Sequence, residues 1–202
     1  NRQRIKVLST GLTESVQGFP PLPHVALELL AIRKLYGGDQ VVNKEFIIPS
    51  LEKELKEGQF TIVHIPSHGQ FKSNVDQTFL LTFDDRVTMA KLDEFVGLFR
   101  FRDDPLDLLT LSACQTAVGD DRAALGLAGV GIKAGARSAV ATLWFINDEA
   151  SSALMAEFYS QLQNPSTSKA IALQRAQQKL LDDPVYQHPA YWAPFLLLNN
   201  WL

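Results

Sequence analysis

The sequence has one cysteine among 202 residues, Cys114, and no run of lysines or arginines. A single thiol excludes an internal disulfide and disfavours a zinc site with thiolate ligands. A formal net charge of -3 and a pI near 5.8 give no electrostatic footprint for nucleic acid. No apolar stretch reaches the length of a membrane span, and no signal peptide stands at the start. We therefore expect no nucleic-acid partner, no membrane partner and a cytoplasmic location.

Internal repeats, low-complexity tracts and long linkers are also missing. Hydrophobic residues make up 46% and charged residues 20% of the chain, as in an ordinary globular protein. Residues 1–202 are therefore expected to form a single domain. Because the chain begins with Asn1 rather than Met, we expect it to be a piece of a larger protein.

Short apolar runs alternate with segments of helical periodicity. Strands are expected at 4–10, 41–42, 60–65, 79–83, 86–88, 106–113, 137–143 and 193–198, and helices at 25–35, 43–58, 89–99, 123–134, 148–162 and 168–181. Asn43 is expected to cap the second of these helices, which Pro49 interrupts. This alternation predicts an α/β fold with a mostly parallel central sheet and helices on both faces.

Two chemically capable residues follow consecutive long strands of this sheet. Cys114 ends the run Leu106–Ala113, and His68 and Gly69 follow the run 60–65. Parallel strands end at the same edge, so the two loops are expected to converge. A nearby imidazole can activate a thiol for attack on a carbonyl, and the amides of Gly69 and Cys114 would form an oxyanion hole.

Each residue also has a plainer interpretation. A lone cysteine is commonly a small buried hydrophobe, and His68 on its own would be a hydrogen-bonded loop residue. His64 lies inside an apolar strand, and we interpret it as a buried, hydrogen-bonded histidine. Spacing alone leaves both interpretations of the Cys114 and His68 pair open.

Several blocks resemble the CHAT domain family, which is related to caspases and separases. They run in family order over most of the chain: His68-Gly69, 111–117 (Leu-Ser-Ala-Cys-Gln-Thr-Ala), 126–129, 135–138, Leu143-Trp144 with Asp148-Glu149, and His188-Pro189 with 191–195. The resemblance implies a caspase-like three-layer sandwich, with Cys114 as the nucleophile and His68 as the proton-transfer residue. It also implies that the chain is the C-terminal part of a larger protein, behind tetratricopeptide repeats or another regulatory domain.

A substrate preference follows from a further resemblance. The segment 143–148 is similar to the part of separases where an acidic residue receives a basic P1 side chain, which would give that role to Asp148. A carboxylate makes charge-assisted hydrogen bonds to Arg or Lys. The alternative is that Asp148 caps the following helix. Asp76, Asp120 and Asp121 are interpreted as solvated loop residues.

The resulting expectation is a cysteine endopeptidase that cleaves protein or peptide substrates after a basic residue and is gated by an upstream or partner domain. The mechanism needs no metal and no organic cofactor, and the chain shows no loop of carboxylates at calcium-ligand spacing. Two other classes stay open: a catalytically latent interaction or scaffold module, and a thiol acyltransferase that uses the same pair with another acceptor.

Overall fold

Eight strands form one sheet in the computed structural model, which describes residues 5–70, 72, 77–99, 105–115, 121–143 and 146–202. In chain order the elements are β1 (Val7–Gly11), α1 (Pro23–Tyr36), β2 (Gln40–Val42), the 3-10 helix η1 (Asn43–Glu45), α2 (Ile48–Glu57), β3 (Ile62–Gln70), β4 (Phe79–Leu81), β5 (Arg86–Thr88), α3 (Met89–Gly97), β6 (Leu108–Gln115), α4 (Asp121–Ala134), β7 (Ser138–Thr142), α5 (Asp148–Leu162), α6 (Lys169–Leu181), α7 (Pro189–Trp192) and β8 (Phe195–Asn199).

The sheet is mostly parallel. Its main path runs β2-β1-β3-β6-β7-β8, and the first five of these strands are parallel to their neighbours. β8 pairs antiparallel with β7, and the small β4-β5 hairpin pairs antiparallel with the end of β3. The expected α/β fold with a mostly parallel sheet is confirmed.

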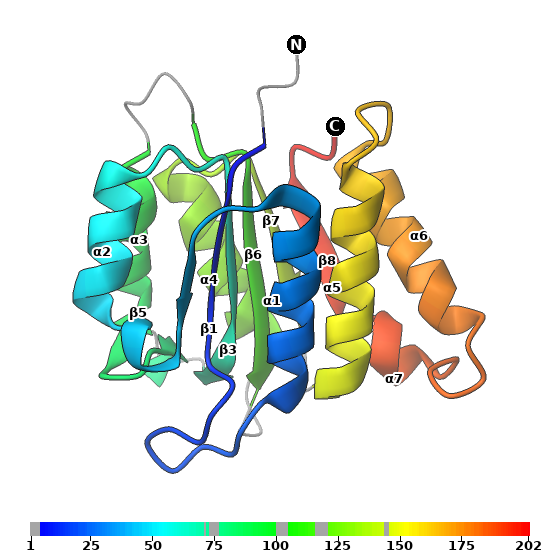
Figure 1. Ribbon diagram of the computed structural model, residues 1–202, viewed down its shortest axis with the longest axis horizontal. Coiled ribbons are helices and arrows are strands. Elements are labelled where there is room, and N and C mark those ends of the chain that lie inside the picture. Colours follow the sequence, from blue (N-terminus) through cyan, green and yellow to red (C-terminus); the bar gives the residue numbers. More distant parts are fainter. Residues whose placement is uncertain (1–4, 71, 73–76, 100–104, 116–120, 144–145) are drawn as a thin grey trace.

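Helices cover both faces of the sheet (Figure 1). Alternate residues of the central strands enter two separate cores: Val63 of β3 packs with α2 and α3, whereas Ile62 packs with α1, α5 and α6. Fully buried Phe158 and Tyr159 of α5 belong to the second core. Burial of each large apolar side chain contributes about 1.5–3 kcal/mol, so the two cores hold the three layers together.

Several helices begin at side-chain caps that the sequence supplies. The side chains of Thr88, Asn147 and Ser168 accept the backbone N–H of the residue three positions on, at the starts of α3, α5 and α6. Such caps satisfy backbone donors that a helix leaves open. For α5 the cap is therefore Asn147, and Asp148 is the first residue of the helix.

The structure corrects the expected helix at 43–58. Asn43 begins a short 3-10 helix with a φ of 52°, and α2 starts five residues later with Pro49 in its first turn. A proline there costs no helical hydrogen bond, so it helps to start the helix instead of interrupting it. The Asn43 side chain accepts the backbone N–H of Thr13 at 2.8 Å, which ties it to the loop after β1.

β3 and β6 are both longer than expected. β3 continues through Gln70 and β6 through Gln115, so His68 and Cys114 lie within strands instead of in the loops beyond them. The extra residues pair with each other, and Gly69 also pairs with Leu80 of the hairpin. The paired region includes Pro66, which lies opposite Ser112 although proline has no backbone N–H to donate.

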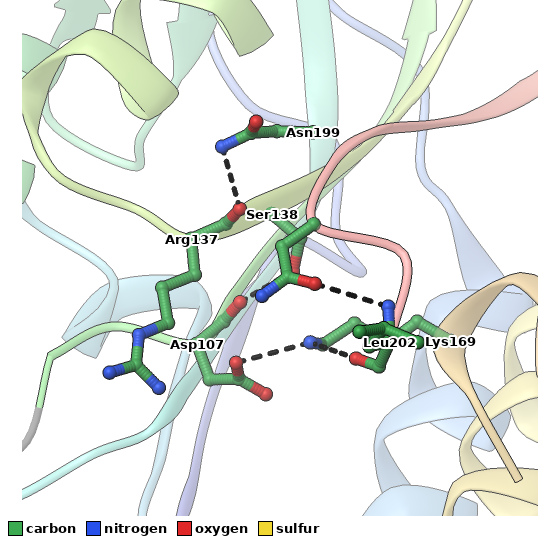
Figure 2. Close-up of polar contacts among 7 residues, drawn as sticks. Asp107, Arg137, Ser138, Lys169, Asn199 and Leu202 are labelled. Atoms are coloured by element: carbon green, nitrogen blue, oxygen red, sulfur yellow. Dashed lines mark hydrogen bonds and ion pairs between the residues drawn. The ribbon is translucent and has the colours of Figure 1, made fainter.

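A buried lysine connects the last described residue to the end of the sheet where the interior strand β6 begins. Lys169 Nζ donates to Asp107 Oδ1 at 3.1 Å and to the backbone carbonyl of Leu202 at 2.8 Å (Figure 2). The side chain of Asn199 donates to the Arg137 carbonyl in the same region. These contacts connect α6 and the segment after β8 to the starts of β6 and β7.

None of the helices in the described part of the chain is long and apolar enough to cross a membrane.

Candidate active site

His68 and Cys114 are direct neighbours across the centre of the sheet. Their Cα positions are register partners in the parallel pair β3·β6. Adjacent strands are about 4.8 Å apart, so the backbone alone brings the two residues together. The structure thus joins the two strands where the sequence predicted convergence, while the thiol itself lies outside what the structure describes.

The His68 ring is held through one of its nitrogens. Nε2 lies 2.7 Å from the backbone carbonyl oxygen of Pro20, in the loop between β1 and α1. Because a carbonyl can only accept, Nε2 carries the proton and Nδ1 of the neutral ring carries the lone pair. Nδ1 is buried and has no hydrogen-bond partner among the described residues. The ring therefore presents Nδ1 as a basic nitrogen.

The surroundings of His68 favour this neutral form. The ring is 1% exposed, and the Phe19 ring lies over it with centroids 5.2 Å apart and planes tilted by 31°. Burial lowers the pKa of His68, whereas the Pro20 hydrogen bond and the charge of Asp148 act in the opposite direction. A lowered pKa keeps the imidazole unprotonated, and so able to act as a base, at neutral pH.

A close backbone approach holds the loop that carries Phe19 and Pro20. Gly11, the last residue of β1, has a φ of 150°, and a Cβ added there would lie 2.7 Å from the Pro66 carbonyl oxygen. The N–H of Leu12 donates to that same oxygen at 3.4 Å. Glycine is required at this point so that the loop can leave β1 directly against β3.

Gly69 is buried between two partners, opposite Gln115 of β6 and Leu80 of β4. It lies next to His68 in β3, as the predicted oxyanion site requires. The role of the Gly69 and Cys114 amides as oxyanion donors stays a prediction.

Asp148 lies near this group at the first turn of α5. Its Oδ2 accepts the backbone N–H of His24 at 2.9 Å, so it joins α5 to the start of α1 and leaves the capping of α5 to Asn147. Burial raises the pKa of Asp148, while the His24 amide and the charges of His24 and His68 lower it. Asp148 is a half-buried carboxylate within electrostatic reach of His68.

Some predicted residues cannot be placed. Asp76 and Asp120 lie outside the described residues, as do Trp144 and Phe145, and Asp121 is described only as the first residue of α4. Within the described part of the chain, no group of three or more His, Cys, Asp or Glu side chains could hold a metal ion.

Sequence reasoning did not find the residues that support His68. Phe19 and Pro20 lie 49 and 48 positions before it in a loop with no periodic pattern, and a backbone carbonyl leaves no trace in a sequence. The only available signal was the concentration of proline and glycine, which marked the segment as a shaped loop.

Comparisons with known proteins bear on the family and the fold. The model of the CHAT domain family matches residues 3–200. The crystal structure of the Arg-specific cysteine proteinase gingipain R superimposes with a TM-score of 0.61 at 7% sequence identity. That alignment covers 97% of this chain and 46% of the proteinase chain. No curated protein sequence matches the chain.

Proposed function

Because the chain belongs to the CHAT domain family of caspase-like cysteine peptidases, we propose that it is a cysteine endopeptidase that uses Cys114 and His68 as a dyad. The observation that carries the proposal is the state of His68. Its Nε2 is fixed on Pro20, and its buried Nδ1 has no partner among the described residues, on the strand position opposite Cys114. An unprotonated imidazole nitrogen can accept a proton, and the strand position opposite Cys114 supports the thiol as the source of that proton.

The proposed reaction has two halves. His68 Nδ1 takes the thiol proton of Cys114, the thiolate attacks the scissile carbonyl, and the amides of Gly69 and Cys114 stabilise the oxyanion. His68 then gives its proton to the leaving amine, which leaves an acyl group on Cys114. In the second half His68 takes a proton from water and the hydroxide attacks the thioester carbonyl. The C–S bond then breaks to release the carboxylic acid, and His68 returns its proton to the Cys114 thiolate.

We assign the basic P1 preference to Asp148. Its carboxylate is half-buried at the same end of the molecule as His68, and partial burial strengthens a charge pair with a substrate Arg or Lys. One oxygen is already oriented by the His24 amide.

Gating by an upstream or partner domain is supported by the covering of His68. A ring that is 1% exposed reaches a leaving amine only after neighbouring segments move. The same covering favours the second candidate function, a latent interaction module, in which the fold is kept and the site never opens.

Labelling with an irreversible peptidyl-arginine electrophile separates these functions. The peptidase proposal expects one adduct, on Cys114, in this chain alone or together with the domain that gates it, and no adduct after Cys114→Ala. The matched control is an electrophile with a neutral P1 residue. Asp148→Asn should slow labelling by the arginyl reagent by about 100-fold, the effect expected for the loss of a desolvated charge pair. Labelling by the neutral reagent should stay unchanged.

Failure of labelling with and without the gating domain, together with full biological activity of Cys114→Ala, would establish the latent module. An acyltransferase would be recognised from products in which the acyl group is joined to an amine instead of to water. A loss that is equal for arginyl and neutral reagents in Asp148→Asn would assign a structural role to this carboxylate.

A further inference from the structure

Three polar contacts attach the segment 20–28 to the rest of the molecule at intervals of four residues. Two are hydrogen bonds, Pro20 O with His68 Nε2 at 2.7 Å and His24 N with Asp148 Oδ2 at 2.9 Å. The third is an ion-pair contact, Glu28 Oε1 with His64 Nε2 at 2.7 Å, whose angles do not meet those of a hydrogen bond. The first two belong to the candidate active site. The third lies one turn of α1 further from the candidate active site, and the proposed reaction does not use it.

The Glu28 and His64 pair is completely buried, with side chains 1% and 0% exposed. Tyr159 of α5 places its ring edge-on to His64, with centroids 5.2 Å apart, and its hydroxyl lies 3.0 Å from Thr110 Oγ1 on β6. Tyr36 of α1 donates to the Tyr159 carbonyl at 2.7 Å. The charge of Asp148 also acts on Glu28. Buried Ser9 of β1 is the register partner of His64, and the Thr10 hydroxyl donates to the His64 carbonyl at 3.0 Å.

Burial of such a pair is poorly explained by stability alone. Burial raises the pKa of Glu28 against the opposing effect of His64, which reflects the cost of removing a carboxylate from water. Two apolar side chains of similar volume would stabilise an interior site at least as well. A polar pair, however, accepts only one relative placement of its two elements, whereas apolar surfaces tolerate sliding.

We propose that Glu28 and His64 are positioning residues, whose contact fixes α1 along β3 and thereby sets the Pro20 carbonyl against His68 and the His24 amide against Asp148. His64 and His68 belong to one face of β3, about 13 Å apart along the strand. Glu28 lies about 6 Å along α1 from His24. The contacts of Pro20 and Glu28 both join the segment 20–28 to β3, so together they define its position along the strand. One contact alone would leave the segment free to pivot.

This inference rests on the proposed function in one respect, the role of His68 as the base. Its test uses the His68 ring directly, through the NMR signal of the Nε2 proton and its exchange with water in this chain. Glu28→Asp keeps the charge and shortens the reach by one methylene. Glu28→Gln keeps the reach and removes the charge.

The proposal expects Glu28→Asp to accelerate Nε2–H exchange by about tenfold or more, and Glu28→Gln to stay within about threefold of the wild type. The double variant Glu28→Leu with His64→Leu avoids an unpaired buried charge, and it should fold and show the same acceleration as Glu28→Asp. Lys169→Met is the matched control, because it removes a buried cation next to the start of β6, at the other end of the strands from His68. It should lower the melting temperature and leave the His68 signal unchanged.

The proposal is overturned if Glu28→Asp, or the folded double variant, leaves the exchange rate unchanged. It is also overturned if Glu28→Gln has the larger effect, since charge would then matter more than reach. If Lys169→Met accelerates exchange of the His68 Nε2 proton equally, the effect of Glu28→Asp comes from general destabilisation and the proposal is also overturned. The NMR pattern does not depend on peptide cleavage, so an inert Cys114 would contradict the proposed function without altering this outcome.

Discussion

His68 and Cys114 are register partners on two adjacent parallel strands, and the ring of His68 is oriented by the carbonyl of Pro20. The pairing fixes the distance between the two backbones, and the carbonyl fixes which ring nitrogen is basic. If the proposed dyad operates, the reactivity of the thiol should depend on the tautomer of His68 that carries its proton on Nε2.

Alkylation of Cys114 measures that dependence. Since this is the only cysteine, iodoacetamide reports one site. We expect His68→Gln to slow alkylation at pH 7 by about 100-fold, the lower end of the usual contribution of a general base. The urea-unfolded proteins should react at equal rates. An unchanged rate in folded His68→Gln would show that the thiol is activated without this imidazole.

The lowered pKa of His68 predicts how stability depends on pH. In the unfolded chain His68 titrates near its ordinary value of 6.5, whereas burial lowers its pKa in the folded protein. The folded state therefore binds fewer protons in this range, and the stability contributed by neutral His68 is complete above pH 6.5 and lost as the pH falls. Urea unfolding of the wild type and His68→Gln between pH 7.5 and 5 should show a smaller acid-side loss in the variant. Parallel curves would contradict the assignment.

Two substitutions should move the pKa of His68 in opposite directions. Phe19→Ala uncovers the ring, so its pKa should rise toward 6.5 as water replaces the aromatic neighbour. Asp148→Asn removes a negative charge that raises the pKa of His68, so its pKa should fall further. NMR titration of the ring measures both shifts. Movement of the two variants in the same direction would show that the dominant effect is a rearrangement of the loop.

Local patterns in the sequence predicted the secondary structure, whereas most contacts between distant residues were not predicted. Apolar periodicity predicted the order of strands and helices, and the parallel topology then placed His68 beside Cys114. The extension of β3 past Pro66 was missed because it depends on pairing with β6 and β4, which no local pattern records. The Pro20 carbonyl was missed for the same reason, since its partner is 48 positions away.

His64 shows a partial success of the same kind. Its apolar neighbours correctly predicted burial. The expected hydrogen bond is not found, because neither ring nitrogen has a hydrogen-bond partner among the described residues. The contact that the ring does make, 2.7 Å from Nε2 to Glu28 Oε1, comes from the buried face of α1. In the sequence nothing distinguishes Glu28 from the exposed glutamates that are common in helices. Only the packing of α1 on β3 identifies the two residues as a pair.

Gly11→Ala tests the close approach that starts the His68 loop. A methyl group there would lie 2.7 Å from the Pro66 carbonyl oxygen and 3.2 Å from Val25, in a backbone conformation with φ of 150° that side chains disfavour. We expect a loss of roughly 2 kcal/mol in the free energy of unfolding, by analogy with other strained or overpacked sites. Gly97→Ala is the matched control, because a Cβ at Gly97 meets nothing within 4 Å. Equal unfolding midpoints for the two variants would contradict the prediction.

Lys169→Met tests whether the contacts of this lysine with Asp107 and Leu202 stabilise the fold without affecting the candidate active site. The lysine is 6% exposed and Asp107 39% exposed, so the aspartate is partly solvated without its partner and the full cost of breaking a buried pair does not apply. We expect a loss of roughly 1–2 kcal/mol in urea unfolding, which also includes the lost hydrogen bond to the Leu202 carbonyl. Asp107→Asn retains an acceptor for the lysine and should lose less. If Lys169→Met unfolds at the wild-type urea concentration, these contacts do not fasten α6 to the sheet.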